Sequence, residues 1–133
     1  MTKRQQMIWK ILMLLYLVAV AYICFAPGDS IPQLPKWNIP IPMDKLVHFT
    51  LFLPFPIVAF FAFNLKGSFK NICLLFLVGI VLAGLTELIQ SFSPTRSMEA
   101  FDFLADSIGI SLSCLLLIFL RKAYGGDGKS RGR

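Results

Sequence analysis

Hydrophobic residues gather into four blocks along this chain, and polar residues lie between the blocks or at their ends. The blocks cover about residues 7–26, 46–64, 71–92 and 103–120. Each block is long enough to cross roughly 30 Å of hydrocarbon as a helix that rises about 1.5 Å per residue. The later connections are short, which predicts antiparallel neighbours. The pattern therefore predicts an all-α polytopic membrane protein, a bundle of four transmembrane helices.

The composition excludes a water-soluble globule. Of the 133 residues, 56% are hydrophobic and 15% are charged, and the mean hydropathy is +0.72, which is too apolar for a domain that folds in water. We assign residues 1–122 to a single transmembrane domain. Within it, residues 27–43 carry five prolines and predict an extended external arm.

Residues 123–133 predict a basic, flexible tail. The tail is short and offers no aromatic platform for bases, so we expect no nucleic-acid partner. Membrane topology and attraction to anionic lipid headgroups explain its charge better.

The positive charges are divided unequally between the two sides of the predicted bundle. Cytoplasmic segments of membrane proteins carry the excess of Lys and Arg. Only Lys36, Lys45 and Arg96 fall on one side. The other side holds the remaining ten, Lys3, Arg4, Lys10, Lys66, Lys70, Arg121, Lys122, Lys129, Arg131 and Arg133. We therefore expect both termini in the cytoplasm.

Local features refine this picture. The first block follows basic residues, as in a secretory signal peptide, but it is as long as a full span, so we interpret it as an uncleaved signal anchor. The chain has three cysteines, an odd number at different depths, and we expect free thiols with neither a disulfide nor a zinc site. Pro54 and Pro56 lie inside the second block and predict a bend.

The acidic residues are as one-sided as the basic ones. Of the seven, only Asp127 falls on the cytoplasmic side, and the others lie at or just inside the external boundary: Asp29, Asp44, Glu87, Glu99, Asp102 and Asp106. Acidic residues contribute little to topology. Their sidedness therefore indicates a shared polar site at the external end of the bundle.

The start of the second span carries Asp44, Lys45 and His48. Asp44 and His48 are one helical turn apart and share a face. Two interpretations stay open. In the first, Asp44 caps the helix and His48 is a core residue whose polar atoms are hydrogen-bonded. In the second, Asp44 or a neighbour orients the imidazole so that it can act as an acid, a base or a ligand.

The end of the third span carries Glu87 and Gln90, and Arg96 follows in the next loop. A carboxylate inside a membrane helix costs roughly 2.5 to 3.5 kcal/mol unless it faces a cavity or a partner. Glu87 therefore either pairs with Arg96 for structural reasons or belongs to a working site. Arg96 suits a phosphate or carboxylate, which its planar guanidinium binds in two-pronged fashion.

The start of the fourth span carries Asp102 and Asp106 on one face, with Gly109 a turn further on. Helix capping explains Asp102 well but Asp106, a full turn inside, less well. Three helix ends thus carry polar residues to one layer of the membrane. We predict His48, Glu87 and Asp102 as catalytic residues or ligands of a divalent cation, and Asp44, Lys45, Gln90, Arg96 and Asp106 as ligand-binding residues.

The motifs Asp44-Lys45-x-x-His48-Phe49, Glu87-x-x-Gln90 before Pro94-x-Arg96, and Asp102-x-x-Ala105-Asp106-x-x-Gly109 together resemble the VanZ-like family of small bacterial membrane proteins. The resemblance covers about residues 43–120. It implies a protein of the bacterial cytoplasmic membrane, in a family whose named member is associated with teicoplanin resistance. Two positions depart from the family pattern, which has Asn in place of Asp106 and a second Gly in place of Ser113.

Two hypotheses for function follow. In the first, the external site binds an anionic lipid or a lipid-linked cell-wall precursor through Lys45 and Arg96, which would alter glycopeptide susceptibility. In the second, the protein is an enzyme that acts on such a lipid, with His48 as base or metal ligand and Arg96 stabilising charge on phosphate. A channel is a weaker third interpretation, because no polar path crosses the bundle.

Overall fold

The computed structural model describes residues 1–26, 38, 40–94 and 99–124. The described chain is helical: α1 (Lys3–Phe25), α2 (Met43–Phe52), α3 (Phe55–Ala62), α4 (Phe69–Gln90) and α5 (Ala100–Tyr124). Four helical segments within it are long and apolar enough to cross a membrane, Lys3–Phe25, Met43–Ala62, Phe69–Gln90 and Ala100–Ala123. The prediction of an all-α chain with four candidate spans is therefore confirmed.

The helices begin before the apolar blocks that predicted them, and at the starts of α1 and α4 polar side chains act as caps. The Thr2 side chain and Gln5 form a capping box at the start of α1, and the Ser68 hydroxyl accepts a hydrogen bond from the Asn71 amide at the start of α4. Capping satisfies backbone N–H groups that have no partner within the helix. At the other end of the chain, α5 continues to Tyr124, past the domain boundary predicted at residue 122.

The predicted bend in the second span is a break between α2 and α3, with Pro54 at the break and Pro56 in the first turn of α3. Proline lacks the N–H group that a continuous helix needs. Beside the break, the Tyr16 hydroxyl of α1 donates to the Leu51 carbonyl at 2.6 Å. A neighbouring helix thus hydrogen-bonds the backbone of the second span next to its break.

The packing brings α5 against both α2 and α4, and α1 against α3. At Gly109 of α5, an added Cβ atom would lie 2.6 Å from the Phe49 carbonyl oxygen and 3.2 Å from the Leu53 amide nitrogen. The backbones of α2 and α5 are therefore in direct contact there, as small residues permit in membrane bundles. Many large apolar side chains remain exposed on all the spans, which suits a surface that faces lipid.

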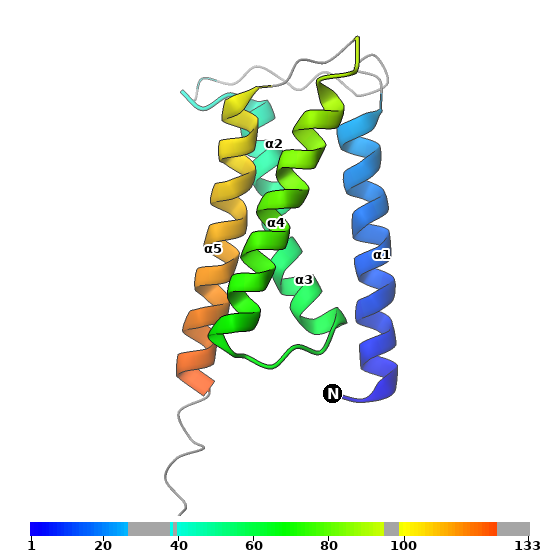
Figure 1. Cartoon of the computed structure of the whole chain (residues 1–133), viewed down its shortest axis with the longest axis vertical. Coiled ribbons are helices and arrows are strands. Elements are labelled where there is room, and N and C mark those ends of the chain that lie inside the picture. Colours follow the sequence, from blue (N-terminus) through cyan, green and yellow to red (C-terminus); the bar gives the residue numbers. More distant parts are fainter. Residues whose placement is uncertain (27–37, 39, 95–98, 125–133) are drawn as a thin grey trace, which may run out of the picture.

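The bundle has two chemically different ends (Figure 1). The N-terminus, the α3–α4 connection and the last turn of α5 lie at one end, with Lys3, Arg4, Lys66 and Lys70. The start of α2, the end of α4 and the start of α5 lie at the other, which we call the cluster end. Cys24 and Cys114 are buried and Cys73 is exposed, and none of the three forms a disulfide in the described structure. Most of the predicted arm and almost all of the tail lie outside the described residues.

Candidate functional site: a polar cluster where three helix ends meet

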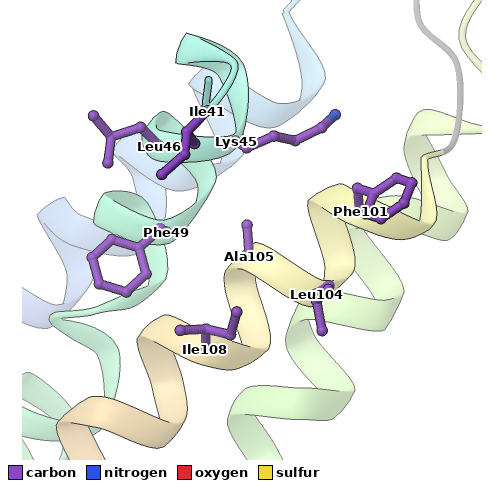
Figure 2. Close-up of a pocket in the computed structure, with 8 residues that line it drawn as sticks. All are labelled: Ile41, Lys45, Leu46, Phe49, Phe101, Leu104, Ala105 and Ile108. Carbon is purple, nitrogen blue, oxygen red and sulfur yellow. The ribbon is translucent and has the colours of Figure 1, made fainter. Parts of the chain in front are cut away.

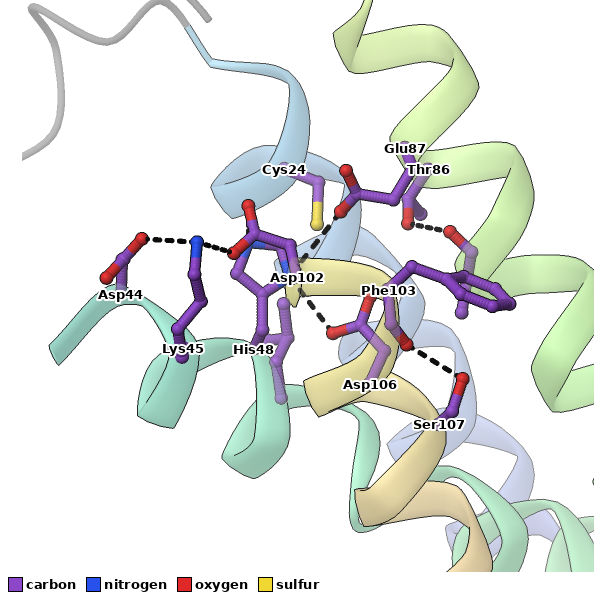
Figure 3. Close-up of polar contacts among 12 residues, drawn as sticks. Cys24, Asp44, Lys45, His48, Thr86, Glu87, Asp102, Phe103, Asp106 and Ser107 are labelled. Atoms are coloured by element: carbon purple, nitrogen blue, oxygen red, sulfur yellow. Dashed lines mark hydrogen bonds and ion pairs between the residues drawn. The ribbon is translucent and has the colours of Figure 1, made fainter. Parts of the chain in front are cut away.

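Three helix ends bring ionisable side chains together at the cluster end (Figure 3). The first two turns of α2 supply Asp44, Lys45 and His48. Asp102 lies in the first turn of α5, where the positive end of the helix dipole favours a carboxylate. Glu87, in contrast, lies near the C-terminal end of α4, where the dipole disfavours a negative charge, so its position there needs another cause.

The exposed half of the cluster is organised around one ammonium group. Lys45 Nζ lies 2.9 Å from Asp44 Oδ2 and 2.5 Å from Asp102 Oδ1, and it also contacts Glu99 Oε2. The Asp44 and Glu99 side chains are 53% and 48% exposed, whereas Lys45 is 14% exposed. The lysine is therefore enclosed by three carboxylates and links α2 to the start of α5.

The buried half is organised around the imidazole of His48. Nδ1 lies 3.0 Å from Asp106 Oδ1 and 3.8 Å from Glu87 Oε1. On the other side of the ring, Nε2 lies 3.6 Å from Asp102 Oδ2. Carboxyl groups of α4 and α5 thus face both ring nitrogens of a histidine on α2.

Two carboxyl groups in this half are buried without full hydrogen bonding. Glu87 is 1% exposed and Asp106 is not exposed at all. Within the described part of the chain, three of their carboxyl oxygens have no hydrogen-bond partner: both oxygens of Glu87 and Oδ2 of Asp106. Leaving such a buried polar group unsatisfied costs about 1–3 kcal/mol, and more when it is charged. These oxygens could therefore accept a further partner, since His48 Nδ1 lies 3.8 Å from Glu87 Oε1, beyond hydrogen-bond distance.

Two groups of three side chains have the geometry to hold a metal ion. In each, one donor atom per residue lies within 4.8 Å of the other two. The exposed trio is Asp44, Glu99 and Asp102, and the Lys45 ammonium already contacts all three. The buried trio is His48, Glu87 and Asp102. Among the described residues the cluster has five carboxyl groups against one lysine and one histidine, namely Asp44, Glu87, Glu99, Asp102 and Asp106.

The structure brings six of the eight predicted site residues together: Asp44, Lys45, His48, Glu87, Asp102 and Asp106. Gln90 is engaged elsewhere, because its Nε2 donates at 2.9 Å to the Cys24 carbonyl and so ties α4 to α1. Arg96 lies outside the described residues. Its predicted roles, as a partner of Glu87 or as an anion ligand, therefore stay predictions.

The capping interpretation of Asp44 was wrong, since the N-cap position of α2 is Pro42 and no side chain caps that end. The other interpretation, in which Asp44 or a neighbour fixes the imidazole, stays a prediction. The structure pairs the imidazole with Asp106, while the Asp44 carboxylate contacts Lys45. Asp102, whose sequence position suggested capping, likewise directs its oxygens to Lys45 and His48. At Asp102 tertiary partners have outweighed local capping, whereas Asp44 pairs with its neighbour in the sequence.

The sequence reasoning missed Glu99 as a cluster residue. It precedes α5, three residues before Asp102, and its carboxylate contacts Lys45. The three-residue spacing was visible in the sequence, since residues so spaced fall on one side of a helix start. Glu99 was counted among the acidic residues of the external boundary but received no role at the site, because nothing in the sequence placed Lys45 near it.

Comparison with known proteins gives one informative relative. An uncharacterized protein of the fission yeast Schizosaccharomyces pombe is 34% identical over 108 residues, which cover 80% of this chain and 60% of the relative. The chain therefore spans less than two thirds of that protein. No protein-family model matches the chain, and no solved structure matches it significantly.

Proposed function

We propose that the buried trio His48, Glu87 and Asp102 binds a divalent cation, and that this cation holds the anionic headgroup of a phosphorylated lipid at the cluster end. The observation that carries the proposal is Glu87: a buried carboxyl group whose two oxygens have no hydrogen-bond partner among the described residues. A bound cation would satisfy those oxygens. It would also account for a carboxyl group at the unfavourable end of a helix dipole.

The donor set suits a transition metal, since one imidazole and two carboxylates are a common ligand set for zinc and related metals. Ligand atoms that share a tetrahedral zinc lie about 3.3–3.6 Å apart at the usual bond lengths, and His48 Nε2 is 3.6 Å from Asp102 Oδ2. Glu87 Oε1 is 3.8 Å from Nδ1 of the same ring, so a cation bound at Nε2 requires the Glu87 carboxyl group to turn toward Asp102. A histidine that binds a metal through one nitrogen is usually oriented by a carboxylate at the other. Asp106, whose Oδ1 lies 3.0 Å from His48 Nδ1, occupies that orienting position.

The charge balance favours a cation over direct binding of an anion by Lys45. We had expected Lys45 to contact the headgroup, but its ammonium is surrounded by Asp44, Glu99 and Asp102. A phosphate that approached these carboxylates alone would be repelled. A divalent cation reverses the local sign and provides a phosphate ligand. Arg96 retains its proposed role as a second contact to the phosphate.

The decisive experiment compares Mn²⁺ binding by the purified chain and two charge-matched variants in lipid nanodiscs, followed by electron paramagnetic resonance. Glu87→Gln removes a ligand of the buried trio, and Glu99→Gln removes a carboxylate of the exposed trio. We expect the first variant to lose at least tenfold in affinity, as ligand-shell changes commonly do, and the second to stay close to wild type. Equal losses in both variants, or no binding by wild type, would refute the proposal.

A second candidate function is catalysis on the same headgroup, and the contact between His48 and Asp106 favours it. An imidazole paired with a buried carboxylate is the usual arrangement of a general base. In this alternative Nε2 of His48 would stay free to accept a proton, and a cation held by Glu87 and Asp102 alone would stabilise charge on a phosphoryl group. Release of phosphate from an isoprenyl phosphate by wild type, lost in Asp106→Asn while Mn²⁺ binding persists, would establish catalysis. Binding without product in both proteins would leave the binding function alone.

We also propose that the chain is a VanZ-like protein of a bacterial cytoplasmic membrane, with both termini in the cytoplasm. The quoted motifs support the first part, and the excess of Lys and Arg at the end opposite the cluster supports the second. The ligand class then includes lipid-linked wall precursors, and changed glycopeptide susceptibility of a deletion strain is the test. The relative from a yeast favours a phosphorylated lipid more general than a bacterial wall precursor.

A further inference from the structure

A groove between α2 and α5 lies directly beside the polar cluster (Figure 2). It encloses about 390 Å³, within the lower part of the range of ligand pockets, about 300–1,000 Å³, and its wall is entirely apolar. The side chains that form it include Leu46 and Phe49 of α2 and Leu104, Ala105 and Ile108 of α5. Such a wall offers no hydrogen bond to a polar ligand, so the groove suits hydrocarbon.

Small side chains on α5 explain the position of the groove. At Gly109 the backbones of α2 and α5 touch, which closes the space between the helices. One turn nearer the cluster end, Ala105 presents only a methyl group, which points from α5 into the space between the two helices in Figure 2. Larger residues on either side, Phe49 and Leu104, then wall a hollow rather than fill it.

The groove and the polar cluster share residues and helix turns. Lys45 lines the groove with its aliphatic stem, while its ammonium contacts Asp102 in the cluster. On α5, Ala105 of the groove directly precedes Asp106 of the cluster. A molecule with a hydrocarbon chain in the groove would therefore have its polar end beside the carboxylates.

We propose that the groove holds the chain of a single-chain lipid phosphate whose headgroup reaches the cation of the cluster, and that this lipid enters sideways from the bilayer. The proposal rests on the function proposed above and specifies its ligand. A groove of about 390 Å³, at the lower end of the range for ligand pockets, has room for part of one hydrocarbon chain and not for two chains side by side.

The test uses dodecyl phosphate with a photoactivatable diazirine in mid-chain, added to the full chain in phosphatidylcholine nanodiscs with Mn²⁺. After irradiation, crosslinked peptides are identified by mass spectrometry. We expect crosslinks at residues 41–49 and 101–108, and competition by unlabelled dodecyl phosphate but not by dodecanol or a diacyl phosphatidic acid. Uniform labelling of lipid-facing residues, or equal competition by phosphatidic acid, would overturn the proposal.

Two substitutions at Ala105 reduce the volume of the groove in steps. Ala105→Phe should fill the groove and reduce crosslinking at least fivefold, and Ala105→Leu, which fills it partly, should reduce crosslinking less. Leu112→Phe is the matched control, because Leu112 is on the same helix, half exposed, and outside the groove. Crosslinking by Ala105→Phe at the wild-type level would refute the chain site.

Mn²⁺ binding separates failure of this proposal from failure of the proposed function. Ala105→Phe should bind Mn²⁺ as wild type does, which also verifies that the variant folds. If wild type binds Mn²⁺ but the crosslinks show no preference for the groove, the proposed site for the lipid's hydrocarbon chain is wrong and the proposed metal site stands. If crosslinks map to the groove but wild type binds no Mn²⁺, the cation-dependent headgroup site is wrong.

Discussion

The contact at Gly109 makes a quantitative prediction about the joint between α2 and α5. A Cβ atom at this position would lie 2.6 Å from the Phe49 carbonyl oxygen, closer than real Cβ contacts. The obstacle is backbone, so a change of side-chain rotamer cannot relieve it. Gly109→Ala must push the two helices apart, and this displacement separates His48 from Asp106, which is one turn away from Gly109.

The expected cost follows from two opposing terms. Overpacking a tight contact costs about 1–3 kcal/mol, and contact with an immovable backbone atom puts Gly109→Ala at the upper end of that range. Replacing Gly by Ala within a helix returns about 1 kcal/mol of helix propensity. We therefore expect a net loss of about 2 kcal/mol in the free energy of unfolding, together with weaker Mn²⁺ binding.

Two other helical glycines provide graded controls. At Gly79 the nearest atom to an added Cβ is a methyl carbon of Ile110 at 3.0 Å, and a side chain can shift. At Gly84 the nearest atom is a ring carbon of Phe103 at 3.7 Å, an ordinary contact. The order of melting temperatures should be Gly84→Ala highest, then Gly79→Ala, then Gly109→Ala.

The cysteines supply the assay. Cys24 and Cys114 are buried, so a thiol-reactive fluorogenic dye reports unfolding in detergent, and a Cys73→Ser background removes the one exposed thiol. A melting temperature of Gly109→Ala equal to that of Gly84→Ala would show that α2 and α5 do not touch at this point. The geometry assigned to the cluster would then be wrong as well.

Two further substitutions test single hydrogen bonds. Tyr16→Phe removes the donor to the Leu51 carbonyl and should lower the free energy of unfolding by about 1 kcal/mol, whereas Tyr22→Phe, at an exposed position, should have no effect on the same dye assay. Ser113→Ala removes a buried hydroxyl that has no hydrogen-bond partner in the described structure, so this variant should have a higher melting temperature than wild type. The control Ser111→Ala loses a hydrogen bond to a carbonyl and should not be stabilised. A lower melting temperature for Ser113→Ala would mean that the Ser113 hydroxyl has a partner.

The sequence predicted the parts of the fold that depend on hydropathy and on proline. Four apolar blocks were sufficient to place four helices, because a helix that faces lipid must be apolar over most of its length. Pro54 and Pro56 were sufficient to place the break. The meeting of three helix ends also followed, since short connections between antiparallel spans return the chain to the same end.

The sequence did not predict which side chains pair within the cluster. Asp44 shares a helical face with His48, yet the imidazole is paired with Asp106 of another helix. Periodicity describes a helix face but not the rotation of one helix against its neighbour. That rotation depends on contacts such as Gly109 against the Phe49 carbonyl, which involve residues about sixty positions apart. Gln90 escaped prediction for the same reason, because its acceptor is a backbone carbonyl of α1.

The origin of the cluster residues sets an order for assembly of the protein during synthesis. His48 enters the membrane with the second span, but its closest partner, Asp106, belongs to the last. Lys45 likewise has only its neighbour Asp44 until Glu99 and Asp102 are made. In a chain that lacks α5, His48 and Lys45 would therefore have none of their α5 partners. The cluster can form only when α5 packs against α2, so its contacts depend on the docking of that helix.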